Sequence, residues 1–178
     1  MSGLRGKVFR HPDGACAIRE PPKEDFELWK ISKYGHIFAL DILQSAKGEQ
    51  FGGFGNELGG EEEVYPFAWI LGHLHRVLPA AGNLYKVLQF EGDVQVEAWL
   101  RNVHGKVFAG GQSFLATKLS SVADDVPASS ICVPSELWSF DLLTNIFYQL
   151  LWPFLSHEDE VTEQAAGDFV QQVFKGRW

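Results

Sequence analysis

Cysteine is nearly absent from the 178-residue sequence, which contains Cys16 and Cys132 and no others. The two are too far apart in sequence to form a short-spaced zinc or redox motif. Each has small or apolar neighbours, among which a free thiol usually packs as a small hydrophobic group. We therefore expect no disulfide framework, no metal site and no other cofactor.

Long apolar runs and clusters of basic residues are missing as well. No segment has the length of a membrane span or of a signal peptide's apolar stretch. The net charge is −8, and the densest charged runs, at 61–63 and 158–160, are acidic. Because nucleic-acid binding requires clustered Lys and Arg, the sequence predicts a cytoplasmic protein that binds neither nucleic acid nor membranes. A cationic ligand or a basic protein partner suits the charge better.

Aromatic residues, in contrast, are abundant: the chain has 14 Phe, 6 Trp and 4 Tyr. Each ring removes a large apolar area from water when it is buried. A chain of this length can form one domain with a sizeable core. The rings could fill a thick core, line an apolar pocket or form a subunit interface, and the sequence leaves these three uses open.

The apolar patterning predicts a single α+β domain over residues 1–178. Its mainly antiparallel sheet would contain an N-terminal hairpin, a central strand and a three-stranded meander, packed against three to four helices. The hairpin is expected at 7–19, where Pro12 and Gly14 suit the second and fourth positions of a type I turn. A helix is expected at 23–34 and the central strand at 36–43.

Residues 66–78 have the clearest helical pattern, with apolar residues at i, i+3, i+4 and i+7, and Pro79 is expected to end this helix. The meander would follow, with strands at 84–90, 94–100 and 106–119 and a turn at 102–105. Residues 120–130 are predicted to be a polar loop.

The C-terminal part, 135–175, is expected to be helical. One strongly apolar helix is predicted at 136–152, with Pro153 at its end. A second is expected to start near Ser156, where acidic residues suit a helix N-terminus, and to run to Phe174.

A ligand-binding face is predicted on the first two strands of the meander. If residues 91–93 form the connecting loop, apolar residues pair and Tyr85 lies opposite Trp99, with Glu97 on the same face. Two rings beside a carboxylate can hold an organic cation. Asp41 interrupts an apolar strand, so it is either exposed at a sheet edge or a buried pocket acid.

The glycine-rich segment 44–63 lacks the Lys-Ser/Thr ending of a phosphate-binding loop and is predicted to be either a mobile lid or a flexible surface loop. His73 and His75 lie two residues apart on the expected helix, so they point to different flanks and cannot share a metal. His73 shares its flank with Arg76.

The abundance of rings favours a non-catalytic binding domain with an aromatic-lined pocket for a small apolar or cationic ligand, and a homo-oligomer. Two alternatives remain open. One is an enzyme that uses Asp41 or His73 as acid or base beneath a glycine-rich lid; the other is a pure interaction module.

Overall fold

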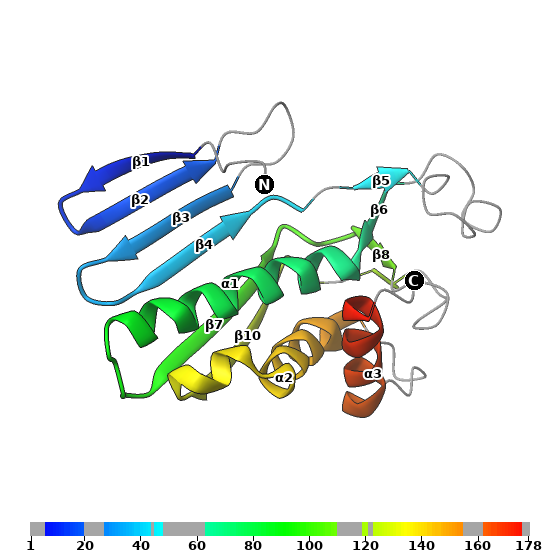
Figure 1. The fold of residues 1–178 in the computed structure, drawn as a ribbon. Coiled ribbons are helices and arrows are strands. Elements are labelled where there is room, and N and C mark those ends of the chain that lie inside the picture. Colours follow the sequence, from blue (N-terminus) through cyan, green and yellow to red (C-terminus); the bar gives the residue numbers. More distant parts are fainter. Residues whose placement is uncertain are drawn as a thin grey trace. The chain divides into compact units, whose positions relative to one another are not determined.

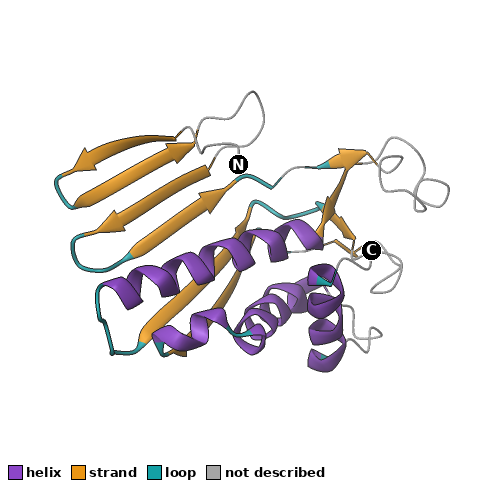
Figure 2. Cartoon of the chain, viewed as in Figure 1, coloured by secondary structure: helices purple, strands orange, loops and turns teal. Residues whose placement is uncertain are grey.

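A computed structural model describes residues 6–19, 27–43, 45–47, 63–109, 119–120, 123–154 and 162–175. These segments combine α-helices with mainly antiparallel strands, which confirms the α+β class (Figures 1 and 2). The chain divides into two compact units, residues 1–44 and 45–178.

The first unit is a four-stranded antiparallel sheet with the strand order β1-β2-β3-β4. The predicted hairpin is confirmed, because β1 and β2 pair through His11 and Gly14 and leave Pro12 and Asp13 as the turn. Gly14 has φ of +154°, and a Cβ there would overlap the carbonyl oxygen of Ile31. The turn therefore requires glycine at this position. The strand bounds are Gly6–His11 (β1), Gly14–Arg19 (β2), Glu27–Ser32 (β3) and Ile37–Asp41 (β4).

The helix predicted at 23–34 is wrong, because residues 27–32 form β3 and residues 33–34 form a turn. Leu28 lies opposite Ile18 of β2 and opposite Leu40 of β4, so β3 is paired with a strand on both sides. The strand predicted at 36–43 is confirmed as β4, but it ends the sheet order instead of lying at its centre.

In the second unit, the predicted helix begins as expected and becomes α1, Phe67–Val87. Pro79 lies inside α1 and does not end it, although an internal proline costs about 3 kcal/mol. The turns on both sides of Pro79 are anchored, since Leu78 and Gly82 are buried. Because of this packing, the helix continues to Val87 and includes part of the segment 84–90, which was expected to be a strand.

The predicted meander is therefore also wrong. β7, Val94–Arg101, pairs instead with β10, Asp125–Cys132, in an antiparallel two-stranded sheet. Residues 125–130 of β10 fall within the segment 120–130 that was predicted to be a polar loop. Buried and exposed residues alternate along β10, so the residues that made the segment look like a loop lie on its exposed face. The buried residues include Val126, Ala128 and Cys132, and the exposed residues include Asp125, Pro127 and Ser129.

Four short strands form the remaining sheet, in the order β5-β6-β8-β9. β6 and β8 are parallel, and the other two pairs are antiparallel. The turn predicted at 102–105 is confirmed, with positive φ at Asn102 (56°) and Gly105 (68°). Residues 48–62 of the glycine-rich segment lie outside the described residues. The bounds are Ala46–Lys47 (β5), Glu63–Pro66 (β6), Val107–Ala109 (β8) and Leu119–Ser120 (β9).

The C-terminal part is helical in its described segments, as expected. The helix predicted at 136–152 is divided by Ser139, whose Oγ accepts the N–H of Leu142 (3.1 Å) and caps α2. The last helix starts after Thr162 and reaches Phe174 as predicted, whereas Ser156 lies outside the described residues. The elements are η2 (Pro134–Trp138), α2 (Phe140–Leu151), η3 (Trp152–Phe154) and α3 (Glu163–Phe174). Among the helices of these segments, not one has both the length and the apolarity that a bilayer crossing requires.

Four phenylalanines form the centre of the core in the second unit. The ring of Phe67 lies 5.3 Å from that of Phe108, 6.0 Å from Phe147 and 5.8 Å from Phe154. All four are buried. These rings join α1, β8, α2 and η3, so much of the aromatic content is used for packing. Leu74 and Leu143, which the helical patterns place on apolar faces, are also buried.

The side chain of Gln149 on α2 covers the outer edge of β10. Its Oε1 accepts the backbone N–H of Ser129 (3.0 Å), and its Nε2 donates to the carbonyl oxygen of the same residue (3.0 Å). Nε2 also donates to Asn145 Oδ1. At Ser129, one side-chain amide thus bonds both backbone groups, as a neighbouring strand would.

Two Leu-to-Ala replacements test this core. Leu71 on α1 has an exposed fraction of 0%, so Leu71→Ala should lower the free energy of unfolding by about 2–5 kcal/mol. Leu88, just after the same helix, is 57% exposed, and Leu88→Ala should cost less than about 1 kcal/mol. Urea unfolding measures both, and equal losses would contradict the assigned helical face.

Candidate functional site

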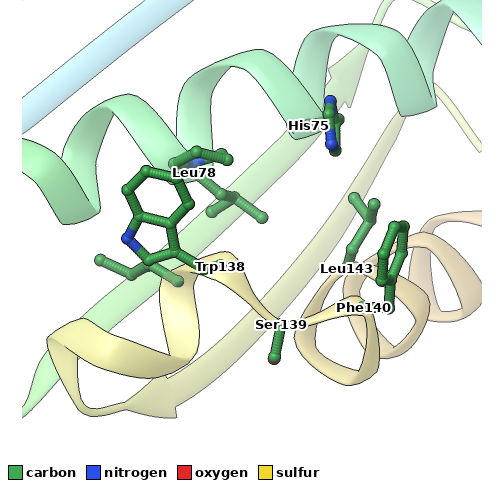
Figure 3. A pocket seen from close by; sticks show the side chains of 8 residues that line it. His75, Leu78, Trp138, Ser139, Phe140 and Leu143 are labelled. Carbon is green, nitrogen blue, oxygen red and sulfur yellow. The ribbon is translucent and has the colours of Figure 1, made fainter. Parts of the chain in front are cut away.

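A pocket of about 190 Å³ lies between α1 and the η2–α2 segment. Figure 3 shows His75 and Leu78 reaching toward it from α1, and Trp138 and Phe140 rising on either side of Ser139. The lining is mostly apolar, as is usual for small-molecule sites. It consists of His75, Leu78, Pro79, Leu137, Trp138, Ser139, Phe140 and Leu143.

The change from η2 to α2 places the two aromatic walls. Leu137 is buried, which fixes η2 against the rest of the unit, and Ser139 is extended before α2 begins. A Cβ on Gly82 would lie 2.6 Å from Trp138 Nε1, so glycine at this position lets the indole approach α1 closely. The positions of Trp138 and Phe140 at the pocket therefore depend on a helix break that the sequence pattern did not predict.

Aromatic rings also form the other end of the pocket. The His75 ring stacks on that of Phe174 from α3, with centroids 4.1 Å apart, and lies 6.4 Å from Phe140. Phe140 is 47% exposed and Trp138 is 54% exposed. Rings this exposed are available for contact with another molecule.

His73 does not line this pocket and interacts with Arg76 on its own flank of α1. The Arg76 guanidinium lies 3.1 Å from Nδ1 of His73, which confirms the shared flank. Because a guanidinium can only donate, Nδ1 acts as the acceptor and the ring proton belongs on Nε2. His73 is therefore not among the residues that line the pocket.

The predicted cluster of Tyr85, Glu97 and Trp99 is not formed as a strand pair. Tyr85 lies on α1, and Trp99 is opposite Pro127 of β10. Glu97 and Trp99 do share the exposed face of β7, as predicted from their alternation. The expected geometry failed because the segment before residue 88 is helical, so no strand is available there to pair with β7.

Each of these predicted residues has a neighbour within its own unit. The Arg101 guanidinium lies 5.3 Å from the Trp99 ring. Glu97 accepts a hydrogen bond from Gln95 (2.8 Å). Asp41 is half-buried at the end of β4 and accepts the N–H of Ile42 (2.9 Å). Ligand binding at these positions stays a prediction.

Tyr85 and Cys132 both have pKa values raised by burial, and Cys132 contributes to the shift of Tyr85 on the covered side of the β7–β10 pair. Burial raises the pKa of the Cys132 thiol, and the negative charges of Glu136 and Asp93 raise it further. Burial also raises the pKa of the Tyr85 hydroxyl, with a smaller contribution from Cys132. Since Trp99 lies on the exposed face, Tyr85 and Trp99 are on opposite sides of this sheet.

The segments that the structure describes hold no group of three or more His, Cys, Asp or Glu arranged to bind a metal ion.

The sequence pattern placed Trp138 and Phe140 inside one continuous helix and so missed their joint role. Pro134 and the capping residue Ser139 were the signals of a break, since both are favoured at helix starts.

No protein-family model, no curated protein and no solved structure matches this chain.

The raised pKa of Cys132 predicts a loss of stability in alkaline solution. Above the pKa of the unfolded thiol, the unfolded chain loses a proton that the folded chain retains, so rising pH favours unfolding until the folded thiol also ionises. Urea unfolding between pH 7 and 10 should show this decline, and Cys132→Ala should show less of it. An unchanged pH slope in the variant would contradict the burial of the thiol as its cause.

Proposed function

We propose that this chain is a non-catalytic binding domain whose α1–η2–α2 pocket takes a small apolar ring. The observation that carries the proposal is a mostly apolar pocket with half-exposed aromatic walls, Trp138 and Phe140. Its volume of about 190 Å³ lies below the range of about 300–1,000 Å³ that is typical of drug-sized ligands. It compares with a cavity of about 150 Å³ that holds benzene.

A ring in this pocket would contact aromatic side chains from two elements of the unit. Trp138 belongs to η2 and Phe140 to α2, and His75 of α1 lies near Phe140. Each well-placed aromatic pair contributes about 0.5–1.5 kcal/mol beyond the burial of its area. We therefore expect weak binding of single-ring compounds.

The exposed face of β7 supports a ligand role less well than the pocket does. Trp99 and Glu97 lie there as predicted, but Tyr85 is on the other side of the sheet. Arg101 already supplies a cation next to the Trp99 ring. An added organic cation would have to compete with this guanidinium and would be repelled by it.

Two Trp-to-Ala variants test the pocket. Trp138→Ala should weaken the binding of benzamide, followed by ligand-observed NMR, about threefold to tenfold because one aromatic wall is lost. Trp152→Ala removes a ring that is 62% exposed and does not line the pocket, so its affinity should equal that of the wild type.

Thermal unfolding of both variants shows whether each is folded before binding is compared. If wild type binds no neutral single-ring compound at millimolar concentration, the proposed function is wrong. Equal losses in the two variants would also contradict it, since only one of the two rings lines the pocket.

We also propose that the chain forms a homo-oligomer through the exposed face of the β7–β10 pair. Trp99 is 49% exposed and Ile131 is 72% exposed, and the alternation of the two strands places both on this face. Exposed apolar side chains on one sheet face are typical of an association surface.

Light scattering after gel filtration tests this association at tens of micromolar. The wild type should be a dimer, and Ile131→Asp should shift it to the monomer because a charge would be buried without a partner. The matched change Val87→Asp, at a position that is 78% exposed outside this face, should leave the dimer intact. A monomeric wild type would overturn the proposal.

A further inference from the structure

We infer that the pocket selects small aromatic acids over aromatic cations of the same size. This inference rests on the proposed function, because it concerns the ligand class of the same pocket. It follows from the polar groups around the ring-sized space.

The polar side chains of the lining are donors or can become donors. His75 donates from one nitrogen when it is neutral and from both when it is protonated. The indole Nε1 of Trp138 lies against Gly82 of α1, at the end of the ring that is away from His75 (Figure 3). The Ser139 oxygen accepts the N–H of Leu142, and its side chain is directed away from α1. His75 is therefore the lining group that suits a ligand that accepts hydrogen bonds.

None of the eight lining residues is acidic, and His75 is the one titratable side chain among them. A cationic ligand would enter the pocket without a counter-charge in its lining, at a cost in desolvation. A carboxylate could approach the imidazole, and a charge-assisted hydrogen bond is about twice as strong as a neutral one.

Each element that surrounds the pocket also carries a charged residue outside the lining. On α1, Arg76 follows His75 and its guanidinium interacts with His73. On η2, Glu136 accepts the N–H of Val133 (3.0 Å). On α2, Asp141 is exposed, and after α3, Lys175 donates to Gln171 (3.1 Å). None of these four residues lines the pocket, so His75 is the group that a bound carboxylate would meet first.

The α2 helix begins at this pocket, and Asp141 in its first turn already supplies a negative charge at the positive end of the helix dipole, so His75 remains the main attraction for an anion. The cap of α2, Ser139, and its first residue, Phe140, both belong to the lining. The positive end of a helix dipole favours negative charge within the first turn. The anionic part of a ligand would therefore lie toward His75, with its ring between the aromatic walls.

Three single-ring compounds of similar size separate the possibilities: benzoate, benzamide and benzylamine. Ligand-observed NMR at pH 6 should show about tenfold tighter binding of benzoate than of benzamide, and the weakest binding for benzylamine. In His75→Gln, which has no charged side chain at this position but keeps an amide donor, the ratio of benzoate affinity to benzamide affinity should fall toward 1. His104→Gln, at an exposed turn position outside the lining, should leave the ratio unchanged.

Tighter binding of benzylamine, or a benzoate preference that persists in His75→Gln, would overturn the inference and leave the proposed function standing. If none of the three compounds binds the wild type, the proposed function itself fails.

Discussion

The packing of Phe67 against three other buried rings is the contact on which the second unit depends. Phe67 is the first residue of α1, and its partners Phe108, Phe147 and Phe154 come from β8, α2 and η3. This cluster fixes where α1 starts relative to α2, and the two helices form the sides of the pocket. The distance between His75 and Phe140, 6.4 Å between ring centroids, is thus set by a core that lies outside the pocket lining.

The parts of the fold that the sequence predicts well are those with a strong local signal. The first hairpin has a proline and a glycine at the required turn positions, and the start of α1 and the end of α3 follow helical periodicity. The errors occur where distant residues decide the structure. Pro79 stays within α1 because the turns around it are packed, and residues 27–32 form a strand because two neighbouring strands pair with them.

The candidate site could likewise be predicted only where residues close together in sequence determine it. The abundance of aromatic residues predicts an aromatic-lined pocket, but pairing across a supposed meander led to Tyr85 and Trp99. The structure places Tyr85 on a helix and gives Trp99 a different strand partner, Pro127. Trp138 and Phe140 become neighbours of α1 through tertiary packing, which periodicity within one segment does not encode.

The pairing of Gln149 with the edge of β10 has a consequence for the behaviour of the chain in concentrated solution. An uncovered strand edge offers its N–H and carbonyl groups to any other extended chain and can seed cross-β growth. At Ser129 both groups are already bonded to one side-chain amide, which is itself bonded to Asn145. At this one position of β10, another extended chain would therefore have to displace the Gln149 amide before it could pair with the strand.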